Sequence, residues 1–220
     1  MQEQLIPKSP RDLPVLSGDL VILRQPSPDD VAIRLEVPAD PELHRMYGGS
    51  GDPKPMTPER AQAFVASIDN QDVSRERKFF IAARRWPDGR PVESATGRCI
   101  GQIRLNIVSW EDQRARMAMG IFDPRFWSHG YGTESLRLIL GYGFDTVGLH
   151  RIDLRVIEYN MRAIRCYEKC GFIREGIERE SGLVDGVWYN DVMMSILEDE
   201  YRDKASLSSS SSSDDATVRE

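Results

Sequence analysis

Short apolar runs alternate with polar turns along this chain, and the spacing within each run predicts a succession of strands and helices. Strands are expected at residues 20–24, 78–84, 99–108, 116–122 and 151–157, and on both sides of a hairpin turn at Asp185-Gly186, the last being 188–197. Runs of this length that are rich in Val, Ile and Phe and bounded by Gly, Pro or Asp are typical of strands.

Helical patterns appear in four other segments. Ser27–Asp30 carries an N-cap signal, and Thr57 before Pro58 carries another, followed by apolar residues three and four positions apart. A third helix is expected from Tyr131 to Asp145, and a fourth from Arg162 to Cys170. This order of elements predicts an α/β fold with a mixed sheet of about seven strands and about four helices.

The two ends of the chain lack this pattern. Residues 1–17 are polar and Pro-rich, and we expect a flexible arm there. Residues 203–220 include a serine run from Ser208 to Ser213, which is expected to be disordered. The folded domain is therefore expected to span residues 18–202.

Composition narrows the classes of function. Asp and Glu number 35 against 29 Lys and Arg, and the resulting net charge of −6 argues against general nucleic-acid binding. The three cysteines have no framework spacing, and the histidines have no metal-ligand spacing, so we expect reduced thiols and no metal. The absence of a signal peptide and of an apolar run long enough to span a bilayer predicts a cytoplasmic protein that is not bound to a membrane.

The segment from Trp127 to Thr133 joins an expected strand to an expected helix and contains Gly130 and Gly132. A helix N-terminus offers unpaired N–H groups and a partial positive charge, and glycines let a phosphate approach them. The segment lacks the ending of a P-loop and the third glycine of a dinucleotide fingerprint. It predicts a phosphate site of another kind, with a plain tight turn as the alternative.

The segment from Asn160 to Phe172 predicts a short capped helix. Asn160 stands at the N-cap, Ala163 and Tyr167 share one face of the helix, and Gly171 fits a left-handed C-cap. Packing in the core would explain each of these residues. A chemical role for Tyr167 follows only when this segment is taken together with the glycine turn.

Together, the two segments resemble the GCN5-related N-acetyltransferases (GNATs), and most closely the RimJ/RimL type, which acetylates the N-terminal amines of ribosomal proteins. The family pattern Gln/Arg-x-x-Gly-x-Gly/Ala is matched by Gly130 and Gly132, whereas Trp127 departs from its first position. The later pattern, Asn-x-x-Ala-x-x-x-Tyr-x-Lys-x-Gly-Phe, is matched throughout from Asn160 to Phe172. The likeness covers about residues 18–200.

The resemblance implies a mostly antiparallel twisted sheet that is splayed centrally and holds acetyl-CoA between strands 116–122 and 151–157. It implies no metal. The backbone of Ile121 and Phe122 is expected to pair with the pantetheine amides, and N–H groups from His129 to Thr133 are expected to take the pyrophosphate. The full set of implied coenzyme contacts is Ile121, Phe122, Trp127, Ser128, His129, Gly130, Tyr131, Gly132, Thr133 and Asn160.

The resemblance also implies direct acetyl transfer to a neutral amine. A backbone N–H on strand 116–122 would polarise the thioester carbonyl, and Tyr167, with an ordinary pKa of about 10, would give a proton to the departing thiolate. Some relatives carry a glutamate base where this chain has Arg155. The base therefore stays open among the candidates Glu111, Asp112, Asp153 and Glu158, or a carboxylate that acts through water.

The acceptor pocket is expected to use residues near the second helix and the closing hairpin. These are His44, Arg45, Met46 and Tyr47, with Trp188, Tyr189, Asn190 and Asp191. Trp188 and Tyr189 have a simpler alternative role as cover for the sheet edge. The acceptor stays open among a protein N-terminus, a polyamine, an amino acid and an amine-bearing antibiotic, and the protein is expected to be a monomer or a homodimer.

Two other functions fit the same sequence. One is an inactive acyl-CoA-binding sensor or interaction protein with this fold, although the presence of Tyr167 argues against it. The other is a binding domain that uses no coenzyme.

Overall fold

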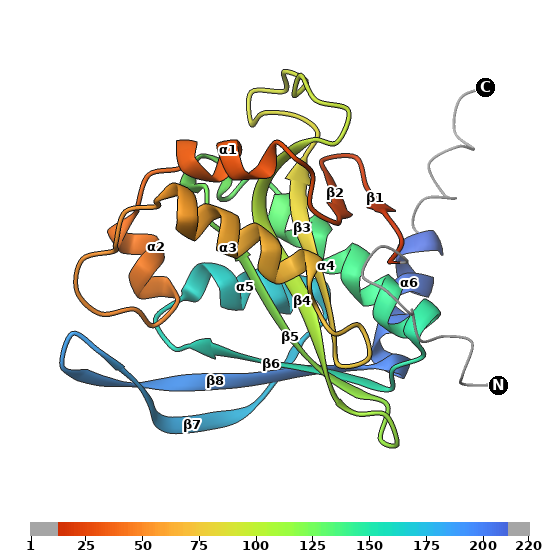
Figure 1. The fold of residues 1–220 in the computed structure, drawn as a ribbon. Helices are drawn as coiled ribbons and strands as arrows, with labels where there is room; N and C mark the ends of the chain where they lie inside the picture. Colours follow the sequence, from red (N-terminus) through yellow and green to blue (C-terminus); the bar gives the residue numbers. More distant parts are fainter. Residues whose placement is uncertain (1–12, 211–220) are drawn as a thin grey trace, which may run out of the picture.

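The computed structural model describes the backbone of residues 13–210 and the side chains of residues 13–204. Its centre is one sheet of eight strands in the order β1-β2-β3-β4-β5-β6-β8-β7 (Figure 1). Neighbouring strands are antiparallel except for β5 and β6, which are parallel. The strands are β1 (Leu16–Ser17), β2 (Val21–Arg24), β3 (Glu76–Ala83), β4 (Arg98–Ser109), β5 (Arg114–Ile121), β6 (Arg151–Ile157), β7 (Ile173–Val184) and β8 (Val187–Leu197).

Helices cover both faces of the sheet. Figure 1 shows α1, α2 and α3 along one side, and α4 and α5 behind the strands. The α-helices are α1 (Asp30–Glu36), α2 (Pro41–Met46), α3 (Pro58–Asp69), α4 (Tyr131–Gly141), α5 (Met161–Cys170) and α6 (Glu198–Ser210). A 3-10 turn at Pro124–Phe126 precedes α4, and a π-helical turn at Tyr142–Val147 follows it.

The two faces of the sheet carry two separate hydrophobic cores. On β3, Phe79 and Ile81 join the large core beneath α4 and α5, whereas Phe80 joins a smaller core beneath α1 and α3. Successive side chains of a strand point to opposite faces, so an uninterrupted apolar run is needed to fill both cores. This part of the sheet is therefore buried between two helical layers, whereas β7 at its edge is mostly exposed.

The expected α/β fold, a mixed and mostly antiparallel sheet, is confirmed. The structure adds β1, α2 and α6 to the expected elements. The signal for α2 was present in the sequence: Asp40 accepts a hydrogen bond from Leu43 N at 2.6 Å and stands before Pro41, the same arrangement as Thr57 before Pro58.

The domain boundaries differ from expectation where the structure describes them. Leu16 and Ser17 pair with β2, so the sheet begins inside the expected arm, and α6 continues through Ser210 into the expected tail. Residues 1–12 and 211–220 of the expected arm and tail lie outside the described residues.

A buried ion pair fastens α1 to the sheet. Arg24 on β2 donates to both carboxylate oxygens of Asp30 at 2.7 and 2.8 Å, and the two residues are 5% and 0% exposed. Asp30 also accepts from Ser27 N at 2.7 Å, just before the helix begins. Removing one partner of such a pair leaves a buried charge without compensation.

Asp30→Asn is therefore expected to lower the free energy of unfolding by about 3–5 kcal/mol. Urea unfolding of the variant and of the wild type would measure the difference. The control is Asp29→Asn, because Asp29 is an exposed neighbour whose side chain makes no cap hydrogen bond. The control should change the free energy by less than about 0.5 kcal/mol. Equal losses in the two variants would contradict a specific role for the Asp30 pair.

Candidate functional site

The parallel strands β5 and β6 are paired only at one end. Their register covers Arg114 with Arg151, Ala115 with Ile152, and Arg116 with Asp153, and no pair follows. Beyond this point β5 stays paired with β4, and β6 stays paired with β8 as far as Ile157. The two strands therefore separate toward their C-terminal ends and leave a gap in the middle of the sheet, as the resemblance implied.

An ion-pair cluster holds the closed end of this gap. Asp153 on β6 is 3% exposed and accepts hydrogen bonds from Nε of Arg114 at 2.7 Å and Nε of Arg116 at 2.6 Å, both on β5. Charge-assisted bonds of this kind are stronger than neutral ones. The cluster sets the position at which the strands begin to separate.

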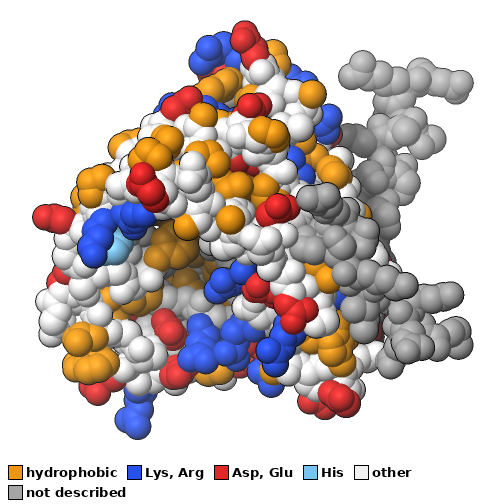
Figure 2. Space-filling view, viewed as in Figure 1, with side chains coloured by type: hydrophobic (Ala, Val, Ile, Leu, Met, Phe, Trp, Pro, Cys, Tyr) orange, Lys and Arg blue, Asp and Glu red, His pale blue; other side chains and the backbone are white. Residues whose placement is uncertain are grey.

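A cavity of about 910 Å³ occupies the gap and continues toward α2 and α5. Figure 2 shows the face hollowed here, with apolar side chains on the floor and Lys and Arg side chains along the lower edge. The lining comes from α2 and the two residues after it, β5, the turn before α4 and the start of that helix, β6, most of α5, and single residues of β7 and β8. A cavity of this size is typical of a small-molecule site.

The glycine turn forms one end of the cavity. Gly130 is the N-cap of α4 with φ of 91°, and Ser128 also has a positive φ of 63°. A Cβ on Gly132 would point at three groups of the cavity wall, including Met119 Cε at 3.5 Å and Cys166 Sγ at 3.7 Å. Because residue 132 has no side chain, the first turn of α4 lines the cavity with its backbone there, which suits an approaching phosphate.

Glu134, in the first turn of α4, faces away from that space. Its carboxylate accepts hydrogen bonds from the backbone N–H groups of Asp19, Leu20 and Val21 at 3.0, 2.8 and 2.8 Å. These bonds tie the start of β2 to the glycine turn. They also spread the negative charge of Glu134 over three donors, which limits its repulsion of an anion at the helix end.

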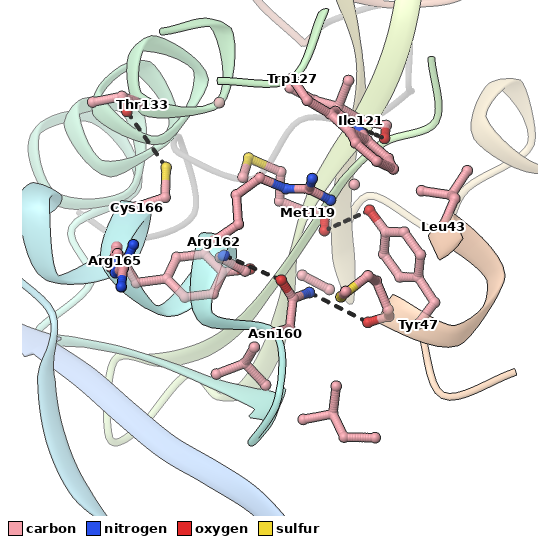
Figure 3. Close-up of a pocket in the computed structure, with 18 of the residues that line it drawn as sticks. Leu43, Tyr47, Met119, Ile121, Trp127, Thr133, Asn160, Arg162, Arg165 and Cys166 are labelled. Atoms are coloured by element: carbon pink, nitrogen blue, oxygen red, sulfur yellow. Dashed lines mark hydrogen bonds between the residues drawn. The ribbon is translucent and has the colours of Figure 1, made fainter. Parts of the chain in front are cut away.

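Trp127 stands where the family pattern has Gln or Arg, and its ring is held between β5 and α5. Its indole N–H donates to the carbonyl of Ile121 at 2.9 Å, at the open end of β5. The guanidinium of Arg162 lies 3.7 Å from the centre of the indole ring, which is a cation–π contact. Figure 3 shows Arg162 extending from α5 across the cavity toward Trp127.

The opposite wall is built from distant parts of the chain. Asn160 caps α5 through Ala163 N at 3.2 Å and donates to the carbonyl of Met46 at 3.3 Å (Figure 3). Tyr159 donates to the carbonyl of Arg45 at 2.6 Å. The C-terminal end of α2 is thereby held against the N-terminal end of α5.

The loop after α2 is also bound to the β7–β8 hairpin. Gly51 N donates to Asp185 Oδ1 at 2.7 Å, Asp185 N donates to Ser50 Oγ at 3.0 Å, and Ser50 Oγ donates to the carbonyl of Leu183 at 3.3 Å. The predicted Asp185-Gly186 turn is confirmed, and both residues have positive φ. These bonds place the hairpin beside the α2 end of the cavity.

Two tyrosines reach the cavity from opposite sides. Tyr167 on α5 is 6% exposed, and burial raises the pKa of its hydroxyl, with smaller contributions from Tyr47 and Cys166. Tyr47 follows α2, and its hydroxyl donates to the carbonyl of Met119 at 3.4 Å (Figure 3). A Cβ on Gly120 would lie 1.9 Å from that hydroxyl, so Tyr47 fits against β5 only because residue 120 is glycine.

Most of the residues expected from the sequence meet in this cavity. The expected residues among its lining are Ile121, Trp127, Ser128, Gly130, Gly132, Thr133, Asn160 and Tyr167. His129 is exposed outside the lining. Tyr131 is 2% exposed and donates to the carbonyl of Arg85 at 2.8 Å, so its side chain belongs to the core. An N–H contact from either backbone to a phosphate stays a prediction.

Phe122 departs from the expectation. Its N–H donates to the carbonyl of Ile100 at 2.9 Å, and its ring packs in the smaller core, away from the gap. Because hydrogen bonds of an antiparallel pair alternate, this bond turns the polar groups of Gly120 toward β4 and those of Met119 and Ile121 toward the gap. The N–H of Phe122 is therefore already paired within the sheet, and a pantetheine contact from its backbone stays a prediction.

None of the four base candidates lines the cavity. Asp153 is held by its two arginines, as described. Glu158 accepts from the backbone N–H and the side-chain amide of Asn190, both at 2.9 Å, and these bonds lower the pKa of its carboxyl. Glu111 and Asp112 lie in the turn between β4 and β5.

Only some of the residues that were expected to form the acceptor pocket line the cavity. Met46, Tyr47 and Asp191 line the cavity, whereas Trp188 is 57% exposed outside it. Tyr189 packs edge-to-face on Tyr159, with ring centres 4.8 Å apart. The remaining expected residues, His44, Arg45 and Asn190, lie outside the lining.

Sequence reasoning missed the cationic part of the lining. Arg162, Arg165 and Lys169 on α5 all reach the cavity, as does Arg155 on β6. The three residues on α5 are three and four positions apart and so share one face of the helix. This pattern is as typical of a solvent-exposed face as of a binding face. Within residues 13–204, no cluster of three or more His, Cys, Asp or Glu side chains could hold a metal ion. No helix in the described part is both long and apolar enough to cross a membrane.

Comparison with known proteins is consistent with this geometry. The profile of the family described as "Acetyltransferase (GNAT) domain" matches residues 21–173. The chain is 27% identical over 184 residues to the uncharacterized N-acetyltransferase YoaA of Bacillus subtilis, covering 84% of this chain and 97% of that protein. It is 29% identical over 144 residues to spermidine N(1)-acetyltransferase of Escherichia coli K12, covering 64% and 70%.

Solved structures show the same fold. The spermidine N-acetyltransferase of Vibrio cholerae, in complex with CoA and spermine, superposes with a TM-score of 0.65. The alignment covers 84% of this chain and 99% of that one, at 20% identity. At this identity the likeness concerns the fold alone.

Replacement of each of the two glycines of the turn by alanine is expected to have a different effect. Gly132→Ala adds only ordinary contacts in the protein, but the methyl fills the space at the helix N-terminus. Unfolding temperature should stay near that of the wild type, and stabilisation by added acetyl-CoA should become smaller. Gly130→Ala, at φ of 91°, should itself lower stability by about 1–2 kcal/mol. Thermal unfolding with and without acetyl-CoA measures both effects. Undiminished stabilisation of Gly132→Ala would contradict a phosphate site at this turn.

Proposed function

Because the chain belongs to the GNAT acetyltransferase family, we propose that it transfers an acetyl group from acetyl-CoA directly to a primary amine. The observation that carries the proposal is the gap between β5 and β6, which has the glycine turn at one end and Tyr167 in its wall. Acetyl-CoA would supply the acetyl group as a reactive thioester. The remaining requirements are binding, orientation and a proton, and the chain has residues suited to each.

The coenzyme phosphates fit the end formed by the turn. Cys166 on α5 lies 3.4 Å from the hydroxyl of Thr133, so these two elements are adjacent. Arg165 and Lys169 on the same helix also line the cavity and form no ion pair within the described residues. Their charges, with the N–H groups of the turn, would attract a pyrophosphate and a further phosphate.

The strand end suits the thioester. The N–H groups of Met119 and Ile121 face the gap, so one of them can donate to the carbonyl oxygen as negative charge develops there. The carbonyl of Met119 accepts a long bond from Tyr47. That bond can be exchanged for one to a pantetheine amide.

Tyr167 would then provide the proton. Because burial raises the pKa of its phenol, the hydroxyl stays protonated at neutral pH and can donate to the sulfur as the C–S bond breaks. The nearby hydroxyl of Tyr47 makes a smaller contribution that also raises the pKa of Tyr167.

The proposal includes an enzyme of the RimJ/RimL type that acetylates a protein N-terminus. It also includes an enzyme that acetylates small amines. Named relatives include spermidine acetyltransferases, which supports a small cationic amine as acceptor. An N-terminal α-amine has an ordinary pKa near 8 and reaches its neutral form more readily than a lysine amine near 10.4.

A panel of amines tests the proposal. Wild-type protein is mixed with acetyl-CoA and each amine, and free thiol is measured over time. Release of thiol that depends on both amine and protein is the expected result. Binding of acetyl-CoA without release for any amine would instead favour the inactive sensor, and no thermal stabilisation by acetyl-CoA would exclude coenzyme binding.

Tyr167→Phe removes only the hydroxyl from the buried ring. Turnover is expected to fall by roughly 10²–10⁴-fold, the usual contribution of a positioned acid, while stabilisation by acetyl-CoA persists. The control is Tyr201→Phe on α6, whose hydroxyl donates to Asp145 at 3.1 Å outside the cavity lining. Steady-state thiol release measures both variants. Turnover of Tyr167→Phe near the wild-type value would remove the hydroxyl from the mechanism.

A further inference from the structure

The acceptor half of the cavity contains one carboxylate without a partner. Two carboxylates line the whole cavity, those of Glu168 and Asp191. Glu168 is paired with Arg174 at 2.8 Å. Asp191 forms no hydrogen bond or ion pair through its carboxylate with any residue that the structure describes, although it is only partly exposed.

The register of the sheet explains where Asp191 points. Val192 and Met194 on β8 belong to the core beneath α4 and α5. Because side chains alternate along a strand, Asp191 faces the other side of the sheet, where it lines the cavity together with Met46 and Tyr47. Its cross-strand neighbours are Ile157 on β6 and Glu178 on β7.

An ion pair keeps the nearby cation away from Asp191. Arg155 lies on the same face of β6 and would be the natural partner of Asp191. It donates instead to Glu178 at 2.5 Å. Arg155, Glu178 and Asp191 together carry one negative charge, and the carboxylate left uncompensated is the one that lines the cavity.

We propose that Asp191 binds the ammonium group of the acceptor and that the acceptor carries a single positive charge within the cavity. The proposal rests on the acetyl transfer proposed above and names the residue and the class of acceptor. An amine with an ordinary pKa of 8 or more arrives mostly as its ammonium form. A partly buried, unpaired carboxylate attracts it and can take its proton, directly or through water, before the nitrogen attacks the thioester.

The other charges of the lining restrict the rest of the acceptor. Beside Asp191 the lining of this half contains Arg155 and Arg162, and Arg162 is only loosely paired, with Glu42 at 3.7 Å. Arg162 is thus the less compensated of the two cations, and a second ammonium group on a short chain would meet its positive charge without a second unpaired carboxylate in the lining. Like-charge contacts of this kind disfavour a ligand. A monoamine with a neutral or anionic remainder fits better than a short diamine.

Asp191→Asn tests the residue. The KM for the amine is expected to rise by roughly tenfold or more, as on loss of a charge-assisted hydrogen bond, while the KM for acetyl-CoA changes by less than about twofold. Glu180→Gln is the matched control, because it removes the same charge from the neighbouring strand β7 outside the lining and should leave both constants unchanged. Thermal unfolding with and without acetyl-CoA verifies that both variants fold and bind the coenzyme.

Pentylamine and 1,5-diaminopentane test the acceptor class, because they share one carbon chain and differ by one ammonium group. The kcat/KM of wild type is expected to be several-fold higher for the monoamine. An amine KM unchanged by Asp191→Asn would overturn the assignment of Asp191. Faster turnover of the diamine would overturn the inference that the acceptor carries a single positive charge. Absence of thiol release by wild type with every amine would overturn the proposed function itself, and the acceptor assignment with it.

Discussion

The cavity depends on the buried carboxylate of Asp153. Two arginines of β5 bind this side chain of β6 at 2.6 and 2.7 Å, and the last register pair of the two strands is the one between Arg116 and Asp153. A parallel pair of strands would ordinarily continue its ladder and close the sheet. Here the outer neighbours β4 and β8 keep their partners while the inner edges separate. The backbone groups at these inner edges make the gap chemically useful, since no neighbouring strand pairs with them there and a ligand can reach them.

The side of the cavity away from the glycine turn has a different origin. It is assembled from segments more than a hundred residues apart, through bonds such as Tyr159 to Arg45 and Gly51 to Asp185. Each is a single hydrogen bond between a side chain and a backbone group and is not part of a strand ladder. Such contacts are exchanged more readily than the pairs of the sheet. The coenzyme half is thus built on rigid elements and the acceptor half on adjustable ones, which is a common division within enzymes of one fold.

Local chemistry explains which features the sequence could predict. Gly171 at φ of 106° and the Asn160 cap follow from signals confined to a few residues, and both are confirmed. Placement of the cavity wall does not follow from such signals. Phe122 was expected to face the gap, but its direction depends on the register between β4 and β5, which no local pattern encodes. The cationic lining was missed for a similar reason, because an arginine on an exposed helix face looks the same whether solvent or a ligand lies opposite.

Glu134 has a consequence for where the folding unit begins. The family profile starts at Val21, yet the three backbone donors to this carboxylate belong to Asp19, Leu20 and Val21. A fragment cut to the matched span would lose most of these donors and leave a half-buried anion beside the helix end that is suited to phosphate. The boundary defined by sequence similarity therefore falls inside a cooperative unit. Expressed fragments, domain grafts and circular permutants of this protein would have to retain the hairpin of β1 and β2 for the glycine turn to keep its shape.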